Sequence, residues 1–373
     1  MHKYDVCTPL LNGNEKKYLI DCIDSGWISS DGPYVKEFET NFSKYIGVNH
    51  GISVSNGTAA LHAAMYALNI QENDEVIMPS FTIISCALSV LRFGAKPVFV
   101  DIESDGWNID ANLIENKINK KTKAIMAIHM YGHPCDFDRI KEIALKYNLL
   151  IIEDASQVHG ALYKQKKCGS LGDISTFSFY ANKIISTGEG GMVLTTNILY
   201  AERARSYRNL CFKPEKRFYH EDLGDNLRLT NLQAAIGLAQ LERINDFVDR
   251  KRINGQAYVK YLGDIEGIKY QIEKPWAKMV YWMYCIQFNE NLGINAKEII
   301  DDLSKMGVSS RPFFLGMHEQ PILRHLSNFK PGEFSNTEKA SRLGLYLPSS
   351  INLEENDIIN IVNILKKILL KYS

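Results

Sequence analysis

The sequence predicts an α/β fold in which a large domain with a mostly parallel sheet is followed by a smaller α/β domain. Between residues 51 and 196, apolar runs of strand length alternate with helix-length periodic segments. Near-continuous runs of Ile, Val and Leu that are separated by helices are typical of a parallel sheet buried on both faces. The chain has 373 residues, which is long enough for two domains.

The elements of the large domain are expected in a regular order. Ligands of parallel sheets bind beyond the carboxyl ends of the strands, so we expect a functional site at that edge. The expected strands are residues 51–55, 75–78, 97–100, 124–129, 149–153, 174–179 and 191–195. The expected helices include residues 58–68, 83–93 and 137–147.

A long amphipathic helix is expected at residues 230–248, and the basic cluster at 250–252 is expected to end it. We place the domain boundary near residue 245, which gives a large domain of residues 1–245 and a small domain of residues 246–373. In the small domain we expect a strand at 281–288, a helix at 296–306 and a C-terminal helix that starts at Glu354.

Composition excludes several classes of protein. Lysine plus arginine and aspartate plus glutamate number 43 each, and no basic stripe suggests a nucleic-acid partner. The seven cysteines form no Cys-x-x-Cys pair, which favours reduced thiols over disulfides or a zinc site. The N-terminus is too polar for a signal peptide, and no apolar run approaches the roughly 20 residues of a membrane span. A cytoplasmic protein without a membrane partner is therefore expected.

The stretch 149–194 carries the strongest functional signal. One apolar run ends at Asp154, and a second strand-like run ends just before Lys183. A lysine and a carboxylate at the ends of two buried strands suit pyridoxal phosphate (PLP). The lysine forms a Schiff base, and the carboxylate keeps the pyridine nitrogen protonated. Desolvation and a neighbouring cationic centre would lower the pKa of this lysine. The alternatives are a solvated surface lysine and an aspartate that caps a helix.

The cofactor's phosphate and ring oxygen also have candidate ligands. Gly57 and Thr58 precede an alanine-rich helix, where unpaired amides and the helix dipole favour an anion. Ser178 offers another hydroxyl group, and Gln157 follows the aspartate closely enough to reach a ring hydroxyl. An ordinary capped helix is the simpler explanation of the first feature alone.

We expect no metal site and no dinucleotide site. None of the nine histidines shows metal-ligand spacing, since a turn at residues 132–134 separates His129 from His133. The glycine-rich loop at 186–191 lacks both the dinucleotide fingerprint and the P-loop pattern, which argues against a nicotinamide oxidoreductase.

These residues lie within longer stretches that are similar to those of a known protein family. The sequence resembles the DegT/DnrJ/EryC1/StrS sugar-nucleotide aminotransferases from about Leu10 to the C-terminal helix. The resemblance implies a PLP-dependent transferase of fold type I, the aspartate aminotransferase-like fold. The resemblance rests on six motifs: SGWISSDGPYV (25–35), SNGTAALHAA (55–64), EDASQVHGA (153–161), GSLGDISTFSF (169–179), NKIISTGEGGMV (182–193) and NLRLTNLQAAIGLAQLERI (226–244).

The resemblance also implies a role for each site residue. Lys183 would carry PLP and move protons between substrate and cofactor, Asp154 would pair with the pyridinium nitrogen, and Gln157 would contact the ring oxygen. The residues implied to hold the phosphate are Gly57, Thr58, Ser178 and the partner subunit's Asn226. A homodimer with shared active sites is therefore expected.

One position departs from the family pattern. Ile83 stands where an aromatic residue usually stacks on the cofactor ring, which forfeits about 0.5–1.5 kcal/mol of aromatic pairing. Some relatives carry a histidine in place of the lysine and perform dehydration. Since Lys183 is present here, the resemblance favours transamination.

Several stretches most resemble family members that transfer the amino group of L-glutamate to C4 of GDP-4-keto-6-deoxymannose, giving GDP-perosamine. A place in O-antigen or other surface polysaccharide synthesis is the corresponding expectation. Arg228 is a candidate for the substrate diphosphate, and Arg311 and His318 lie in a segment that borders the substrate in relatives. A structural salt bridge or a packing role is the alternative for each of the three.

Two other functions stay open at this point. The same chemistry can act on a UDP- or dTDP-linked keto sugar, at C3 or C4, because Gln157 replaces a glutamate expected in many GDP-sugar enzymes of this type. The second open function is that of a catalytically silent PLP-fold dimer with a binding or regulatory role, and only Ile83 favours it.

Overall fold

The computed structural model describes residues 3–213, 215–216, 218–263, 265–326, 329–330 and 332–372. Its main sheet is built from strands that match the expected ones to within a few residues. These strands are β1 (His50–Val54), β2 (Glu75–Pro79), β3 (Lys96–Val100), β4 (Thr122–Ile128), β5 (Leu150–Asp154), β8 (Ile174–Ser178) and β9 (Gly191–Thr195). Their order across the sheet is β1-β9-β8-β5-β4-β2-β3.

Most neighbouring strands of this sheet are parallel. The pairs β2–β3, β2–β4, β4–β5 and β5–β8 are parallel, whereas β9 is antiparallel to both β1 and β8. The two reversals at β9 leave β1 running in the same direction as β8 and β5. The carboxyl ends of these three strands therefore meet at one edge, and the predicted mostly parallel α/β architecture is confirmed.

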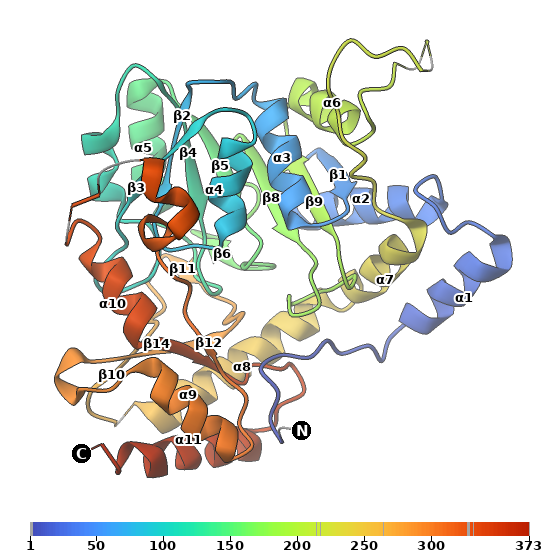
Figure 1. Ribbon diagram of the computed structural model, residues 1–373. Helices are drawn as coiled ribbons and strands as arrows, with labels where there is room; N and C mark the ends of the chain where they lie inside the picture. The colour runs from blue at the N-terminus through green and yellow to red at the C-terminus, as the bar shows by residue number, and fades with distance from the viewer. Residues whose placement is uncertain are drawn as a thin grey trace.

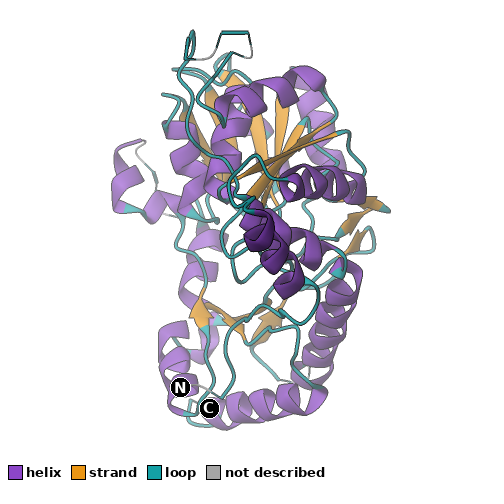
Figure 2. Cartoon of the chain, turned by 90° about the vertical axis from the view of Figure 1, so that its right-hand side faces the viewer, coloured by secondary structure: helices purple, strands orange, loops and turns teal. Residues whose placement is uncertain are grey.

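Helices surround the main sheet in both views of the molecule (Figures 1 and 2). They are α1 (Glu15–Ser25), α2 (Pro33–Ile46), α3 (Gly57–Ala67), α4 (Ile84–Leu91), α5 (Phe137–Tyr147), α6 (Ile198–Tyr207) and α7 (Asn231–Leu241). Short elements that the periodicity did not reveal form a small accessory sheet. They are β6 (Leu162–Tyr163), β7 (Lys166–Lys167) and β11 (Ala277–Lys278).

The C-terminal part forms a second layered unit below the main sheet in Figure 1. Its sheet has the order β10-β12-β14-β13, and helices α9 and α11 lie beneath it. Its strands are β10 (Ile268–Tyr270), β12 (Tyr284–Phe288), β13 (Arg311–Pro312) and β14 (Gly344–Leu347). Its helices are α8 (Ile244–Leu262), α9 (Ala296–Lys305), α10 (Ser335–Leu343) and α11 (Glu355–Leu369).

The expectation of one helix at residues 230–248 is wrong. The chain leaves helical geometry at Arg243, whose φ is −115° and ψ is 9°, so that α7 and α8 are separate helices. The basic cluster at 250–252 lies inside α8 and does not end it. A helix interior accepts such charges where each finds a partner: buried Lys251, for example, donates a hydrogen bond to the carbonyl of Trp282 at 2.8 Å.

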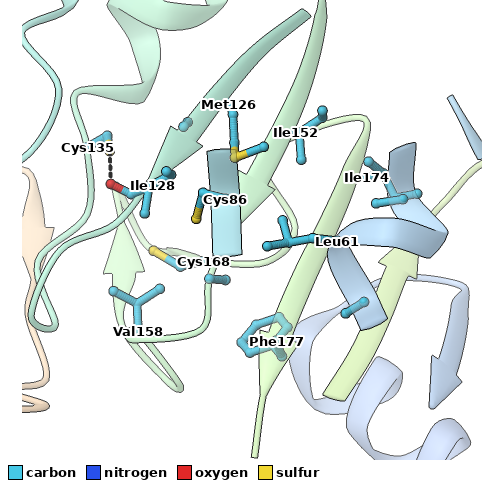
Figure 3. Packing of buried hydrophobic residues seen from close by; sticks show 14 of the residues in the cluster. Leu61, Cys86, Met126, Ile128, Cys135, Ile152, Val158, Cys168, Ile174 and Phe177 are labelled. Atoms are coloured by element: carbon cyan, nitrogen blue, oxygen red, sulfur yellow. Dashed lines mark hydrogen bonds between the residues drawn. The ribbon is translucent and has the colours of Figure 1, made fainter. Parts of the chain in front are cut away.

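Buried apolar side chains gather in two clusters. The larger one covers the main sheet, and Figure 3 shows part of it, with Leu61 and Phe177 packed near the strands. The second one fills the C-terminal unit and includes Tyr4, so the beginning of the chain packs with its end. We keep the division at residue 245 as a proposal. No helix among the described residues combines the length and apolarity needed to cross a membrane.

Candidate active site

The carboxyl-terminal edge of the main sheet collects the predicted cofactor residues. Asp154 is the last residue of β5, and Ser178 is the last residue of the neighbouring β8. Lys183 follows β8 after a short turn in which its backbone N–H donates to the carbonyl of Tyr180 at 2.8 Å. Gly57 begins α3 shortly after β1. The sheet thus brings together groups that are far apart in the sequence.

A cavity of about 620 Å³ opens at this edge. Its size is in the range of sites for small molecules. Six of the predicted residues line it: Gly57, Thr58, Ile83, Gln157, Ser178 and Lys183. Asp154 is not in the lining itself and lies behind it, only 5% exposed.

The Lys183 side chain lies in a poorly solvated position. Its Nζ is 3.8 Å from the centroid of the Trp282 ring. Burial lowers the pKa of Lys183 to about 8, while the charge of Asp154 acts in the opposite direction. About a tenth of this amine is therefore unprotonated at pH 7, far more than for a lysine in water, and the unprotonated form is what a nucleophile and proton carrier requires.

The Asp154 carboxylate is held by two donors. Its Oδ1 accepts a hydrogen bond from the backbone N–H of Ser156 at 3.0 Å, and its Oδ2 accepts one from Sγ of Cys86 at 3.4 Å. Burial, reinforced by the charge of Asp154, raises the pKa of Cys86 well above its usual value, so the thiol stays protonated and donates. Figure 3 shows Cys86 among the buried side chains of the core. Turns follow β5, so Asp154 does not cap a helix.

The Gln157 amide has a defined orientation. Its Oε1 accepts a hydrogen bond from the backbone N–H of Tyr131 at 2.7 Å. The NH₂ group is therefore the part that Gln157 can offer to a ligand, and it selects a hydrogen-bond acceptor. Tyr131 has a φ of 53°, a left-handed conformation that is rare for a bulky side chain and typical of functional sites.

The start of α3 forms a cradle for an anion. The Asn56 side chain caps the helix by accepting a hydrogen bond from the N–H of Ala59 at 2.8 Å. A Cβ atom at Gly57 would lie 2.8 Å from the Cβ of Ser178, so only glycine allows the helix start and β8 to approach this closely. The Thr58 hydroxyl donates to Oγ of Ser85 at 3.1 Å. Backbone amides, a helix dipole and hydroxyl groups suit a phosphate.

The potential ligand atoms of His129, Glu153 and Cys168, all buried, lie as close together as the ligands of a metal site. Hydrogen bonds account for the first two residues. The Nδ1 of His129 accepts from the N–H of Cys135 at 2.9 Å, so Nε2 carries the proton and faces Oε1 of Glu153 at 3.0 Å. Glu153 also accepts from the N–H of Leu171 at 2.8 Å. The expectation of no metal stays a prediction.

Two predicted residues before α7 lie outside the main cavity. Asn226 is exposed, and Nη1 of Arg228 donates to Oδ1 of Asn209 at 2.6 Å. Arg228 lines a separate cavity of about 200 Å³ together with Arg205 and Arg208. Within this chain neither residue lines the cavity, although the backbone of Arg228 pairs with Val54 at the end of β1 and Leu227 lines the cavity.

The substrate candidates from the C-terminal unit also lie outside the main cavity. Arg311 is exposed on β13, although its strand partner Tyr346 does line the cavity. His318 has its Nδ1 2.7 Å from Oγ of Ser80, and its ring stacks on Phe334 with the centroids 4.4 Å apart. These contacts are those of a packed side chain, and substrate binding by His318 stays a prediction.

Part of the cavity wall was missed by the sequence reasoning. Trp282, Phe314 and Tyr346 line the cavity from the C-terminal unit. No spacing relates them to Lys183, because about a hundred residues or more separate each from it. The aromatic residues at 281–284 and at 313–314 were available signals, and nothing in either stretch identifies which ring faces the lysine.

Comparison with known proteins agrees with this geometry. The sequence model described as the DegT/DnrJ/EryC1/StrS aminotransferase family matches residues 9–366. The chain belongs to this family. Members of the DegT/DnrJ/EryC1/StrS family are PLP-dependent sugar aminotransferases, so the predicted fold class and enzyme class are confirmed.

Individual relatives cover nearly the whole chain. It is 42% identical to GDP-perosamine synthase of Caulobacter vibrioides, over 98% of both proteins. It is 39% identical to GDP-perosamine synthase of Vibrio cholerae, over 97% of this chain and 98% of that protein. The solved structure of DesI with its TDP-sugar product has a TM-score of 0.90 at 28% identity, over 99% of this chain and 93% of DesI.

Proposed function

We propose that this aminotransferase moves the amino group of L-glutamate to C4 of a nucleotide-linked 4-keto-6-deoxyhexose. The substrate we propose is GDP-4-keto-6-deoxymannose, and the product is GDP-perosamine. One observation carries the chemical part of the proposal: an amine whose pKa is lowered to about 8, that of Lys183, lies beside Asp154 at the ends of two adjacent strands. The identities of 42% and 39% to two GDP-perosamine synthases support the substrate.

The residues of the cavity fit PLP. The cradle at Gly57, Thr58 and Ser178 offers amides and hydroxyl groups for the phosphate. The buried carboxylate of Asp154 is suited to the protonated ring nitrogen, and the Gln157 NH₂ group is suited to the ring oxygen. When bound, PLP supplies an electron-poor ring that stabilises charge at the carbon next to the transferred nitrogen.

Three side chains at the cavity would have different roles in the reaction. Lys183 would hold the cofactor covalently and would carry the proton at the substrate carbon. The buried carboxylate of Asp154, held by Cys86 and Ser156, would face the ring nitrogen. Ile83, 43% exposed at the cavity wall, would cover the ring with an aliphatic surface.

We further propose a homodimer in which the partner subunit's Asn226 completes the phosphate site. The support is that Asn226 is exposed and lies outside the cavity of its own chain. Mixing inactive Lys183→Ala protein with Asn226→Ala protein is expected to restore activity, because each mixed dimer contains one intact site. Activity assays of the refolded mixture check this expectation. A mixture no more active than its two components would contradict shared sites.

The GDP-sugar assignment is tested by substrate competition. We expect kcat/KM for GDP-4-keto-6-deoxymannose to exceed that for the UDP- and dTDP-linked keto sugars by at least about 10-fold, the scale on which pocket contacts discriminate between substrates. The measurement follows product formation from each sugar with L-glutamate as donor.

A dTDP-linked sugar is the second candidate, supported by the 28% identity to DesI, which was solved with its TDP-sugar product. A higher kcat/KM for the dTDP-linked sugar would replace the GDP assignment and leave the transamination chemistry in place.

A further inference from the structure

The side chain of Trp282 makes two contacts with the turn that carries Lys183. Its ring faces the lysine, with Nζ 3.8 Å from the ring centroid. Its Nε1 donates a hydrogen bond of 2.7 Å to the carbonyl of Asn182, the residue directly before the lysine. A tryptophan face attracts an ammonium group more strongly than any other side-chain ring does. Trp282 therefore contacts both the amine of Lys183 and the backbone of the turn that carries it.

Trp282 itself is fixed from the C-terminal unit. It is 5% exposed, belongs to the larger apolar cluster and lies two residues before β12. Its carbonyl accepts a hydrogen bond of 2.8 Å from Nζ of Lys251, which is 1% exposed on α8. Its ring lies nearly parallel to that of Tyr131, at 16° and 6.2 Å between centroids. A side chain held at so many points presents its ring in a single orientation.

We propose that Trp282 is a positioning residue for Lys183, whose indole ring holds the protonated amine and releases it when the proton leaves. The proposal rests on the function proposed above only in treating Lys183 as the reactive amine. It assigns a role in the reaction to a residue of the C-terminal unit.

The physical basis is a balance between opposing effects on one amine. Burial disfavours the ammonium form, whereas the carboxylate of Asp154 favours it. The face of the Trp282 ring also favours the charged form. Lys251, the other buried cation nearby, is directed at the carbonyl groups of Trp282 and Ser349. The attraction of the ring exists only for the charged amine, so deprotonation frees the side chain to turn into the cavity.

Fluorescence of the cofactor-free full-length protein tests the contact directly. An ammonium group against the ring alters indole emission, so we expect a transition with a midpoint near pH 8 in the wild type. The transition should vanish in Lys183→Met, which removes the charge, and in Trp282→Phe, which removes the indole. Trp27→Phe is the matched control, since Trp27 is 51% exposed, and it should keep the transition.

Two results would overturn the proposal: no transition in the wild type, or a transition that persists in Lys183→Met. The comparison of the wild type with Lys183→Met tests the contact between the amine and the ring even if Trp282→Phe fails to fold. None of these measurements requires bound cofactor. A cofactor found on another lysine would therefore refute the proposed function and leave this result standing.

A second variant separates positioning from packing. Trp282→Leu keeps an apolar wall but has no ring face, so the titration midpoint of the Lys183 amine should fall by about 0.5–1 pH unit. The midpoint is measured by NMR on the ¹³C-methylated lysine, assigned by its absence in Lys183→Met. An unchanged or raised midpoint would show that Trp282 only fills space, and would refute the positioning role.

Discussion

Replacing Lys183 with alanine is expected to lower kcat by at least about 10⁴-fold, because one amine serves as both the covalent anchor and the proton carrier. Lys251, a buried lysine on α8, provides no substitute because it is directed at backbone carbonyl groups. The measurement is glutamate-dependent product formation at saturating substrate.

Lys164→Ala is the matched control for this substitution. Lys164 is exposed and paired with Asp138, so its loss should leave kcat within about twofold, as expected for a surface ion pair. A Lys183→Ala enzyme that kept a tenth or more of wild-type kcat would contradict the assigned role.

Asp154→Asn is expected to lower kcat by about 10²–10³-fold, the scale on which a single preorganised electrostatic group acts. The amide keeps the shape of the carboxylate but loses the charge that holds a ring nitrogen protonated. The Cys86 thiol, at 3.4 Å, stays a donor and gives no replacement charge. Steady-state kinetics and retention of PLP on dialysis are the measurements.

Asp24→Asn is the control for this change, because Asp24 is exposed on α1. The control should retain both kcat and cofactor. If Asp154→Asn kept wild-type kcat while Asp24→Asn did the same, the carboxylate would have no electrostatic role in the reaction.

Much of the large unit could be predicted because its pattern is local. Buried parallel strands need runs rich in apolar residues, and polar residues such as Asp154 and Ser178 stand at the ends of two of them. Strand ends of a parallel sheet share one edge, so a site beside Asp154 could be predicted from the sequence. That the start of α3 reaches the same edge depends on the antiparallel β9, which lies between β1 and β8.

The features that could not be predicted from the sequence depend on packing between distant segments. The break between α7 and α8 at Arg243 has no proline or glycine to signal it, and the buried position of Lys251 depends on carbonyl groups of distant segments. The approach of Trp282 to Lys183 likewise depends on how the C-terminal sheet docks. Periodicity within a short window contains no information about either contact.

The covalent attachment point of the cofactor tests the central claim most directly. Borohydride reduction of the PLP-loaded protein, followed by proteolysis and mass spectrometry, should place the label on Lys183. Lys251 is the telling alternative, since burial lowers its pKa as well. A label on Lys251, or on any lysine other than Lys183, would contradict the account.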